Sequence, residues 1–119
     1  MASAWTAIDT FWNSFSIPAY DENTVPDDAV MPYITYEAAT GGMDFKVPLN
    51  AHIYYRTTSW QVISDKAQEI SDYIEGGAGV PYDNGRMWVT KRTPFAQRMA
   101  DPDDTNVRRV LIQVEAEFQ

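Results

Sequence analysis

The sequence has no cysteine and only one histidine, His52. Without thiols, a disulfide framework and a thiolate metal site are both excluded, and the absence leans weakly toward a cytosolic compartment. A single histidine excludes a metal site built from several imidazoles, and a His–Asp–Ser arrangement would depend on this one side chain. Because His52 lies on the polar face of an expected strand, we interpret it as a surface or interface residue.

Long apolar runs are also missing. No stretch approaches the roughly 20 apolar residues needed to cross a bilayer, and the segment from Met1 to Trp5 lacks the basic region of a signal peptide. We therefore expect a soluble, intracellular protein. The 119 residues, of which 45% are hydrophobic, suit one folded domain. We expect a single α+β domain over residues 1–119.

Basic residues are missing from the first part of the chain. Residues 1–45 contain seven acids and no Lys or Arg, and the whole chain has a net charge of −8. This balance opposes nucleic-acid binding, which needs clustered cations. Two electrical characters are expected where one side of a subunit meets the opposite side of its neighbour, although solvated faces that happen to differ are the alternative. Six of the nine basic residues lie in one later segment: Arg86, Lys91, Arg92, Arg98, Arg108 and Arg109.

Two segments have the period of a helix. Over residues 3–16, aromatic and apolar side chains recur every three or four positions, which predicts a helix with Ser3 as its N-cap and a buried face. The second helix is predicted to begin at Thr58-Ser59-Trp60-Gln61, which resembles a capping box, and to end at Gly76-Gly77. The first apolar stripe consists of Trp5, Ile8, Phe11, Trp12 and Phe15.

Four segments alternate in the period of a strand, and the rest is predicted to be loop. Residues 17–31 are rich in proline and acids and predict a mobile acidic loop or arm. Residues 93–105 predict a second loop. The predicted strands are residues 32–38, 46–56, 86–92 and 106–119. The order helix, strand, strand, helix, strand, strand predicts an α+β two-layer sandwich, an antiparallel sheet of about four strands with both helices on one face.

The acidic segment Asp101-Pro102-Asp103-Asp104 is the strongest candidate for a metal loop. Its spacing fails as an EF-hand, because Asn106 stands where the loop needs glycine and Ile112 where it needs glutamate. An Asx-type turn before the last strand explains the segment, with a divalent ion site between subunits as the alternative. Elsewhere the glycines follow a helix and the carboxylates lack apolar flanks. We expect no enzyme, no metal and no cofactor.

Aromatic residues interleaved with arginine are typical of protein interfaces. The expected sheet would carry such a set on the face that the helices do not cover. Ordinary surface residues with their stems packed on the sheet are the alternative. The set is Tyr54, Arg56, Trp88, Arg92, Arg109 and Leu111.

The run "VPLNAHIYYRTTSW", the helix after it, the run "VPYDNGRMWVTKRTPFAQRMADPDDTNVRRVLIQVEAEF" and the short aromatic N-terminal helix resemble small tail-terminator or tail-completion proteins of tailed bacteriophages, the siphophages and prophages. The resemblance covers about Trp5 to Phe118. It implies an α+β subunit of a ring, typically a hexamer, at the head-proximal end of the tail tube. Such a ring ends tube polymerisation and joins tail to head, so the protein would belong to the tail or neck of a virion assembled in the host cytoplasm.

The resemblance also implies partners: other copies of the chain, the tail-tube protein and a head-tail connector protein. DNA would pass through an acidic lumen without specific binding, since like charges repel. A head-completion, connector or other neck protein is the main alternative. A small ligand-binding or enzymatic domain and a monomeric regulator are two others. On charge and loop length, the candidate interface residues are Asp27, Asp28, Arg56, Trp88, Arg92, Arg98, Asp101, Asp103, Asp104, Arg108 and Arg109.

Overall fold

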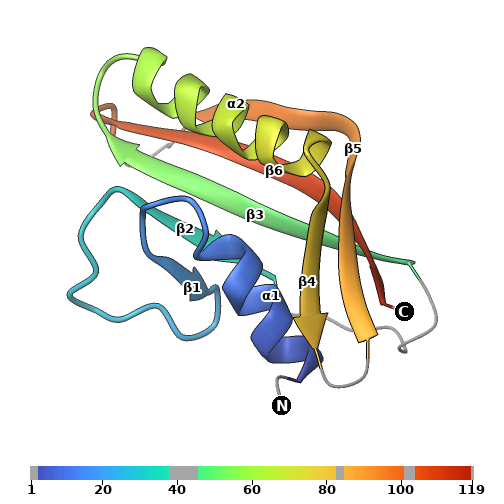
Figure 1. Cartoon of the computed structure of the whole chain (residues 1–119). Helices are drawn as coiled ribbons and strands as arrows, with labels where there is room; N and C mark the ends of the chain where they lie inside the picture. Colours follow the sequence, from blue (N-terminus) through green and yellow to red (C-terminus); the bar gives the residue numbers. More distant parts are fainter. Residues whose placement is uncertain (1–2, 38–45, 83–84, 101–103, 119) are drawn as a thin grey trace.

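A computed structural model describes residues 3–37, 46–82, 85–100 and 104–118. They contain two helices and six strands, and each helix is followed by three strands (Figure 1). No helix among them is long and apolar enough to cross a membrane. The elements are α1 (Ala4–Trp12), β1 (Ala19–Asp21), β2 (Tyr33–Tyr36), β3 (Lys46–Arg56), α2 (Gln61–Glu75), β4 (Ala78–Tyr82), β5 (Gly85–Ala100) and β6 (Val107–Phe118).

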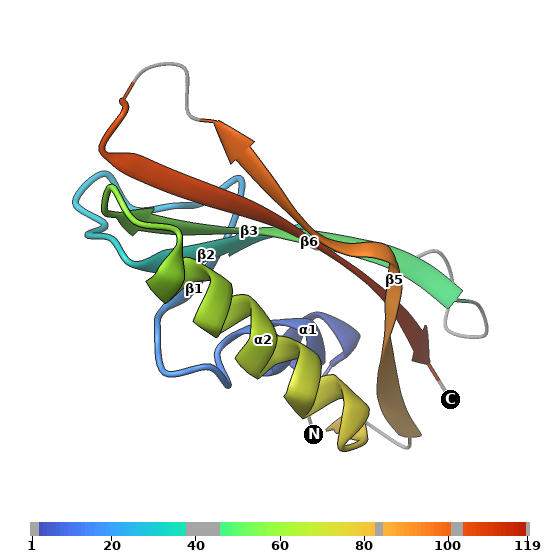
Figure 2. The same cartoon turned by 90° about the horizontal axis from the view of Figure 1, so that it is seen from above.

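The six strands form one mixed sheet in the order β1-β2-β3-β6-β5-β4. β1 and β2 are parallel, and every other neighbouring pair is antiparallel. The centre is the long pairing of β3 with β6, which runs from Lys46 opposite Glu117 to Arg56 opposite Val107. The register of β5 on β6 shifts between Lys91 and Ala96. Such a bulge increases local twist, and the sheet curls here (Figure 2).

The predicted two-layer sandwich with about four antiparallel strands is therefore wrong: the sheet has six strands, is mixed and is curled into a half-barrel. Three extended segments were missed. β1 lies inside the segment predicted to be all loop, β4 lies just before Asn84, and β5 continues through Pro94 to Ala100 where a loop was predicted. Each contains or adjoins a proline, and each belongs to an edge of the sheet or to the bulge, where a missing N–H donor is tolerated.

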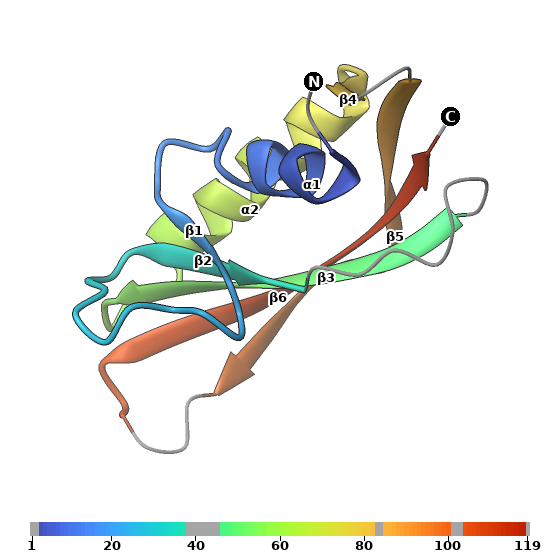
Figure 3. The same ribbon diagram turned by 90° about the horizontal axis from the view of Figure 1, so that it is seen from below.

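Both helices pack on the concave face of the sheet (Figures 2 and 3). The alternation predicted for residues 46–56 is confirmed, because Val47, Leu49, Ala51 and Ile53 are all buried on this face. Val47, Leu49 and Ile53 each contribute roughly 1.5–3 kcal/mol by leaving water. Helix α2 and strand β6 supply much of the remaining core: Ile63, Ala67, Ile70, Ile74, Val110, Ile112, Val114, Ala116 and Phe118.

Helix α1 begins as predicted and is tied to the first edge strand. Ser3 Oγ accepts a hydrogen bond from the Thr6 amide at 3.2 Å. At the other end, the Asn13 side chain accepts from the Ala19 amide at 3.0 Å and donates to the Ala19 carbonyl at 3.3 Å. The predicted stripe is buried except for Trp5, which is 51% exposed. Helix α1 and β1 are therefore one unit at the β1 edge.

Helix α2 begins without the predicted capping box. Its N-cap is Trp60, whose side chain makes no capping hydrogen bond. Instead, Ser59 Oγ accepts a hydrogen bond from the Gln61 amide at 3.1 Å. The predicted end at the paired glycines is confirmed, because Gly77 has φ of 95°, a conformation that favours glycine. The Trp60 side chain therefore does not cap the helix and instead packs against the core.

Candidate assembly site on two opposite edges of the sheet

The second half of β5 has one neighbouring strand among the described residues. β4 pairs only with Gly85–Val89, whereas β6 pairs with β5 on the other side as far as Ala100. The opposite edge of residues 90–100 is therefore open. Arg92 and Arg98, both exposed, lie on this stretch. We call residues 90–100 the basic edge.

Trp60 holds two arginines of the candidate set. The guanidinium carbon of Arg98 lies 5.0 Å from the centre of the Trp60 ring, and that of Arg108 lies 5.2 Å from it. Arg108 also donates to the carbonyls of Thr58 and Thr105, at 2.9 and 2.8 Å. Each cation over the indole contributes roughly 0.5–1 kcal/mol at an exposed site.

Arg98 retains charge that no acid of the described chain neutralises. Besides the ring of Trp60, its recorded contact is a long hydrogen bond of 3.5 Å from Nη2 to Ser64 Oγ. No carboxylate pairs with it among the described residues. The Arg98 side chain is thus positioned by an aromatic ring and a hydroxyl, with hydrogen-bond donors to spare.

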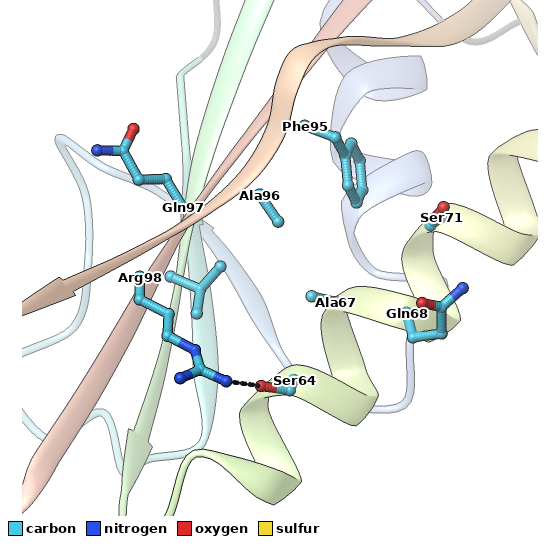
Figure 4. A pocket seen from close by; sticks show the side chains of 9 residues that line it. Ser64, Ala67, Gln68, Ser71, Phe95, Ala96, Gln97 and Arg98 are labelled. Atoms are coloured by element: carbon cyan, nitrogen blue, oxygen red, sulfur yellow. Dashed lines mark hydrogen bonds between the residues drawn. The ribbon is translucent and has the colours of Figure 1, made fainter.

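A cavity of about 250 Å³ lies between α2 and the basic edge. Figure 4 shows Arg98 and Ser64 at one end and Phe95 and Ser71 at the other. At the Ser71 end of the cavity, Lys91 links β5 to α2, because its ammonium donates to Ser71 Oγ at 3.0 Å and to the Glu75 carboxylate. The lining is partly apolar and partly polar, and the Gln97 side chain points away from α2 (Figure 4). The apolar residues are Ala67, Phe95, Ala96 and Val110, and the polar residues are Ser64, Gln68, Ser71, Gln97 and Arg98.

The acidic arm, residues 22–31, lies at the opposite edge, beside β1 and β2 (Figures 1 and 3). Hydrogen bonds between residues close in sequence form turns in the arm. The Asn23 amide donates to Asp21 Oδ1 at 2.9 Å, and the Ala29 amide donates to the Pro26 carbonyl at 3.1 Å. Asp27 and Asp28 are exposed and have no ion-pair partner among the described residues. Val30 is 77% exposed, the largest fraction recorded for a large apolar side chain in the described chain.

The convex face of the sheet carries part of the predicted aromatic and arginine set. Tyr33 and Tyr54 are neighbours, with ring centres 5.2 Å apart, and Tyr54 lies opposite Arg109 across the strand pair. His52 lies opposite Leu111. Burial, and then the charge of Arg109, lowers the pKa of His52. The strand register thus brings together Tyr54, Arg109 and Leu111. Figure 2 shows both helices on the opposite face of the sheet.

The other predicted residues are dispersed. Arg56 forms an ion pair of 2.9 Å with Asp104 of the same chain. The Asp104 carboxylate also accepts from the Asn106 amide at 2.9 Å, and this backbone bond, followed by Arg56, lowers the pKa of Asp104. That geometry is the expected Asx turn. Asp101 and Asp103 lie outside the described residues, as does any metal loop that they would form.

Trp88 lies at the far end of β5, on the convex face, away from Arg98. It is 41% exposed and covers Gly79 of β4, where a Cβ would lie only 2.6 Å from the indole ring. The Arg86 guanidinium lies 6.0 Å from that ring. Within the described ranges, no three His, Asp or Glu side chains come together as metal ligands. The candidate site therefore consists of the basic edge and the acidic arm, which lie at opposite edges of the sheet.

Sequence reasoning missed the cavity, the role of Trp60 and the exposure of Val30. Trp60 fits the apolar face predicted for the second helix. The helical period therefore did not distinguish Trp60, which contacts two arginines, from an ordinary core residue. Val30 stands in a segment without periodicity, which gives no expectation of burial. The sequence does show two valines, Val25 and Val30, each two positions from the acid pair, but it does not show which of them is exposed.

Comparison with known proteins gives a likeness in structure and none in sequence. The sequence matches no protein-family model and no curated protein. Among solved structures, a chain in the virion of a native gene transfer agent particle is similar, with a TM-score of 0.59 and 15% identical residues. The match covers 95% of this chain and 84% of that chain. At this identity, the likeness shows a shared fold.

Proposed function

We propose that this chain is a structural protein of a tailed, phage-like virion. The single observation that carries the proposal is the shared fold, which extends over 95% of the chain, with a chain of a gene transfer agent virion. The sequence resemblance to tail-terminator proteins supports the same class by an independent route.

We further propose a particular place in the particle. The chain forms a ring at the head-proximal end of the tail tube, ends tube polymerisation and joins the tail to the head. The opposite positions of the basic edge and the acidic arm support this, because a ring needs a head-to-tail contact between unlike surfaces of adjacent copies. The proposed partners are other copies of the chain, the tail-tube protein and a head-tail connector protein. No catalytic step is part of the proposal.

Native mass spectrometry over a range of protein concentrations tests self-assembly, and electron microscopy after addition of the cognate tail-tube protein tests termination. A closed oligomer and tubes of limited length with a cap at one end are the expected results. Co-sedimentation separates the two neck roles, since a terminator follows purified tails and a head-completion protein follows purified heads. A monomer at every concentration, with tube protein present, would contradict the proposal.

A further inference from the structure

We infer that the tip of the acidic arm of one copy, residues 27–30, seats in the cavity between α2 and the basic edge of the next copy. Val30 packs against the apolar part of the lining, and a carboxylate of Asp27 or Asp28 pairs with Arg98. This inference rests on the proposed self-assembly and names the contact that holds neighbouring copies together.

The cavity has the size and lining for such a tip. A dry cavity of roughly 150 Å³ admits a ring the size of benzene, so about 250 Å³ has room for an aliphatic side chain with part of its backbone. Ala67, Ala96 and Val110 offer it apolar contacts along the lining. Ser64 and Gln68 at the rim offer hydrogen bonds to the backbone that follows the side chain inward.

The arm has the matching chemistry. Val30 is 77% exposed, so its burial would remove apolar surface from water. Asp27 and Asp28 stand within three residues of it and are exposed. On the opposite side, Arg98 is fixed over Trp60 yet lacks a carboxylate within the described chain. An aliphatic anchor in a pocket with paired polar groups at its rim is an arrangement suited to a binding interface.

The placement makes the contact one between copies. The arm lies beside β1 and β2, and the cavity lies beside β5, at the other side of the strand order. A tip from one edge that fits a cavity at the other edge gives a head-to-tail contact, in which each copy offers both halves.

Disulfide trapping tests the contact directly, because the chain has no cysteine of its own. The double variant Val30→Cys with Gln68→Cys places one thiol on the tip and one at the rim. Mild oxidation is expected to give a ladder of covalently linked copies. The matched control, Val30→Cys with Val62→Cys, uses an exposed α2 valine that does not line the cavity, and it is expected to give no ladder.

A charge exchange gives the second readout. Val30→Asp and, separately, Arg98→Glu are each expected to raise the apparent dissociation constant of the oligomer roughly tenfold or more. Asp27→Lys with Asp28→Lys is expected to restore assembly of Arg98→Glu. Arg92→Glu is the control for a charge reversal on the basic edge outside the cavity, and it is expected to change the constant less.

The outcomes separate this inference from the proposed function. If the unaltered protein assembles, yet Val30→Asp keeps its oligomer and the Val30 and Gln68 thiols do not link, the seated arm is wrong and the ring proposal stands. If the unaltered protein is monomeric at every concentration and with tube protein, both are wrong.

Discussion

Several polar side chains on the convex face of the sheet have atoms that are buried from water and have no hydrogen-bond partner among the described residues. His52 Nδ1, Asn50 Oδ1 and Arg109 Nε are buried atoms without a hydrogen bond among the described residues. An unpaired buried polar atom costs about 1–3 kcal/mol. His52 carries the added repulsion of Arg109 when it is protonated, so this face favours the neutral imidazole.

The first prediction concerns pH. Because the pKa of folded His52 is lowered, the unfolded chain binds the proton first, near its ordinary pKa of about 6.5. The stabilisation from neutral His52 is complete above that pH and is lost as the pH falls through the lower, folded value. The free energy of unfolding of the native protein should therefore fall, relative to that of His52→Gln, between pH 7.5 and 5.5. Urea unfolding measures it. Glu37, whose pKa burial raises, is common to both proteins and cancels; parallel pH profiles would contradict the prediction.

The second prediction concerns Gly79. A methyl group there would lie 2.6 Å from the Trp88 ring, so Gly79→Ala should reduce the free energy of unfolding by roughly 1–3 kcal/mol through overpacking. Gly76→Ala is the matched control, because its Cβ would meet nothing closer than 3.4 Å. In a Trp88→Ala background, the cost of Gly79→Ala should shrink. Equal costs in both backgrounds would show that the ring is not the obstacle.

At the scale of elements, the sequence pattern predicted the central parts of the molecule and missed its edges. β3 and β6 alternate over their whole lengths because one face is buried, and α1 and α2 follow the helical period for the same reason. β1 has only three residues and β4 contains Pro81, so neither has a pattern long enough to read. The candidate site lies beside β1 and along the second half of β5, where a loop was predicted. Its charged residues could therefore be named from the sequence, but its cavity could not.

The third prediction concerns how α2 holds β5. Trp60→Leu removes the ring shared by Arg98 and Arg108 and should lower the free energy of unfolding by roughly 1–2 kcal/mol, at 0.5–1 kcal/mol for each cation. Hydrogen exchange should rise at Ala96–Ala100 more than in the core of β6. Trp5→Leu is the control, because Trp5 is 51% exposed and its loss should cost less than about 0.5 kcal/mol. Uniform exchange changes would contradict a local tie.

At the scale of the whole molecule, two electrostatic effects oppose each other. In the proposed assembly, the net charge of −8 would repel copies from one another, whereas the acidic arm of one copy and the basic edge of the next would attract each other. The two act over different distances. The subunit measures 44 × 29 × 22 Å along its principal axes, so the bulk charges of adjacent copies are separated by more than the Debye length of about 10 Å at 0.1 M salt. Charges paired across a contact lie well within that length.

The fourth prediction follows from this difference in range. Above about 0.1 M salt the net repulsion is already screened, so any further response reports the close pairs. Between 0.1 and 1 M sodium chloride, the apparent dissociation constant of the oligomer should rise roughly tenfold or more as the arm and the edge lose their attraction. Asp27→Asn with Asp28→Asn should weaken assembly at 0.1 M and flatten the salt response, as measured by native mass and sedimentation. An oligomer that tightens with salt would point to an apolar contact, for which the row of Tyr33 and Tyr54 on the convex face is the surface at hand.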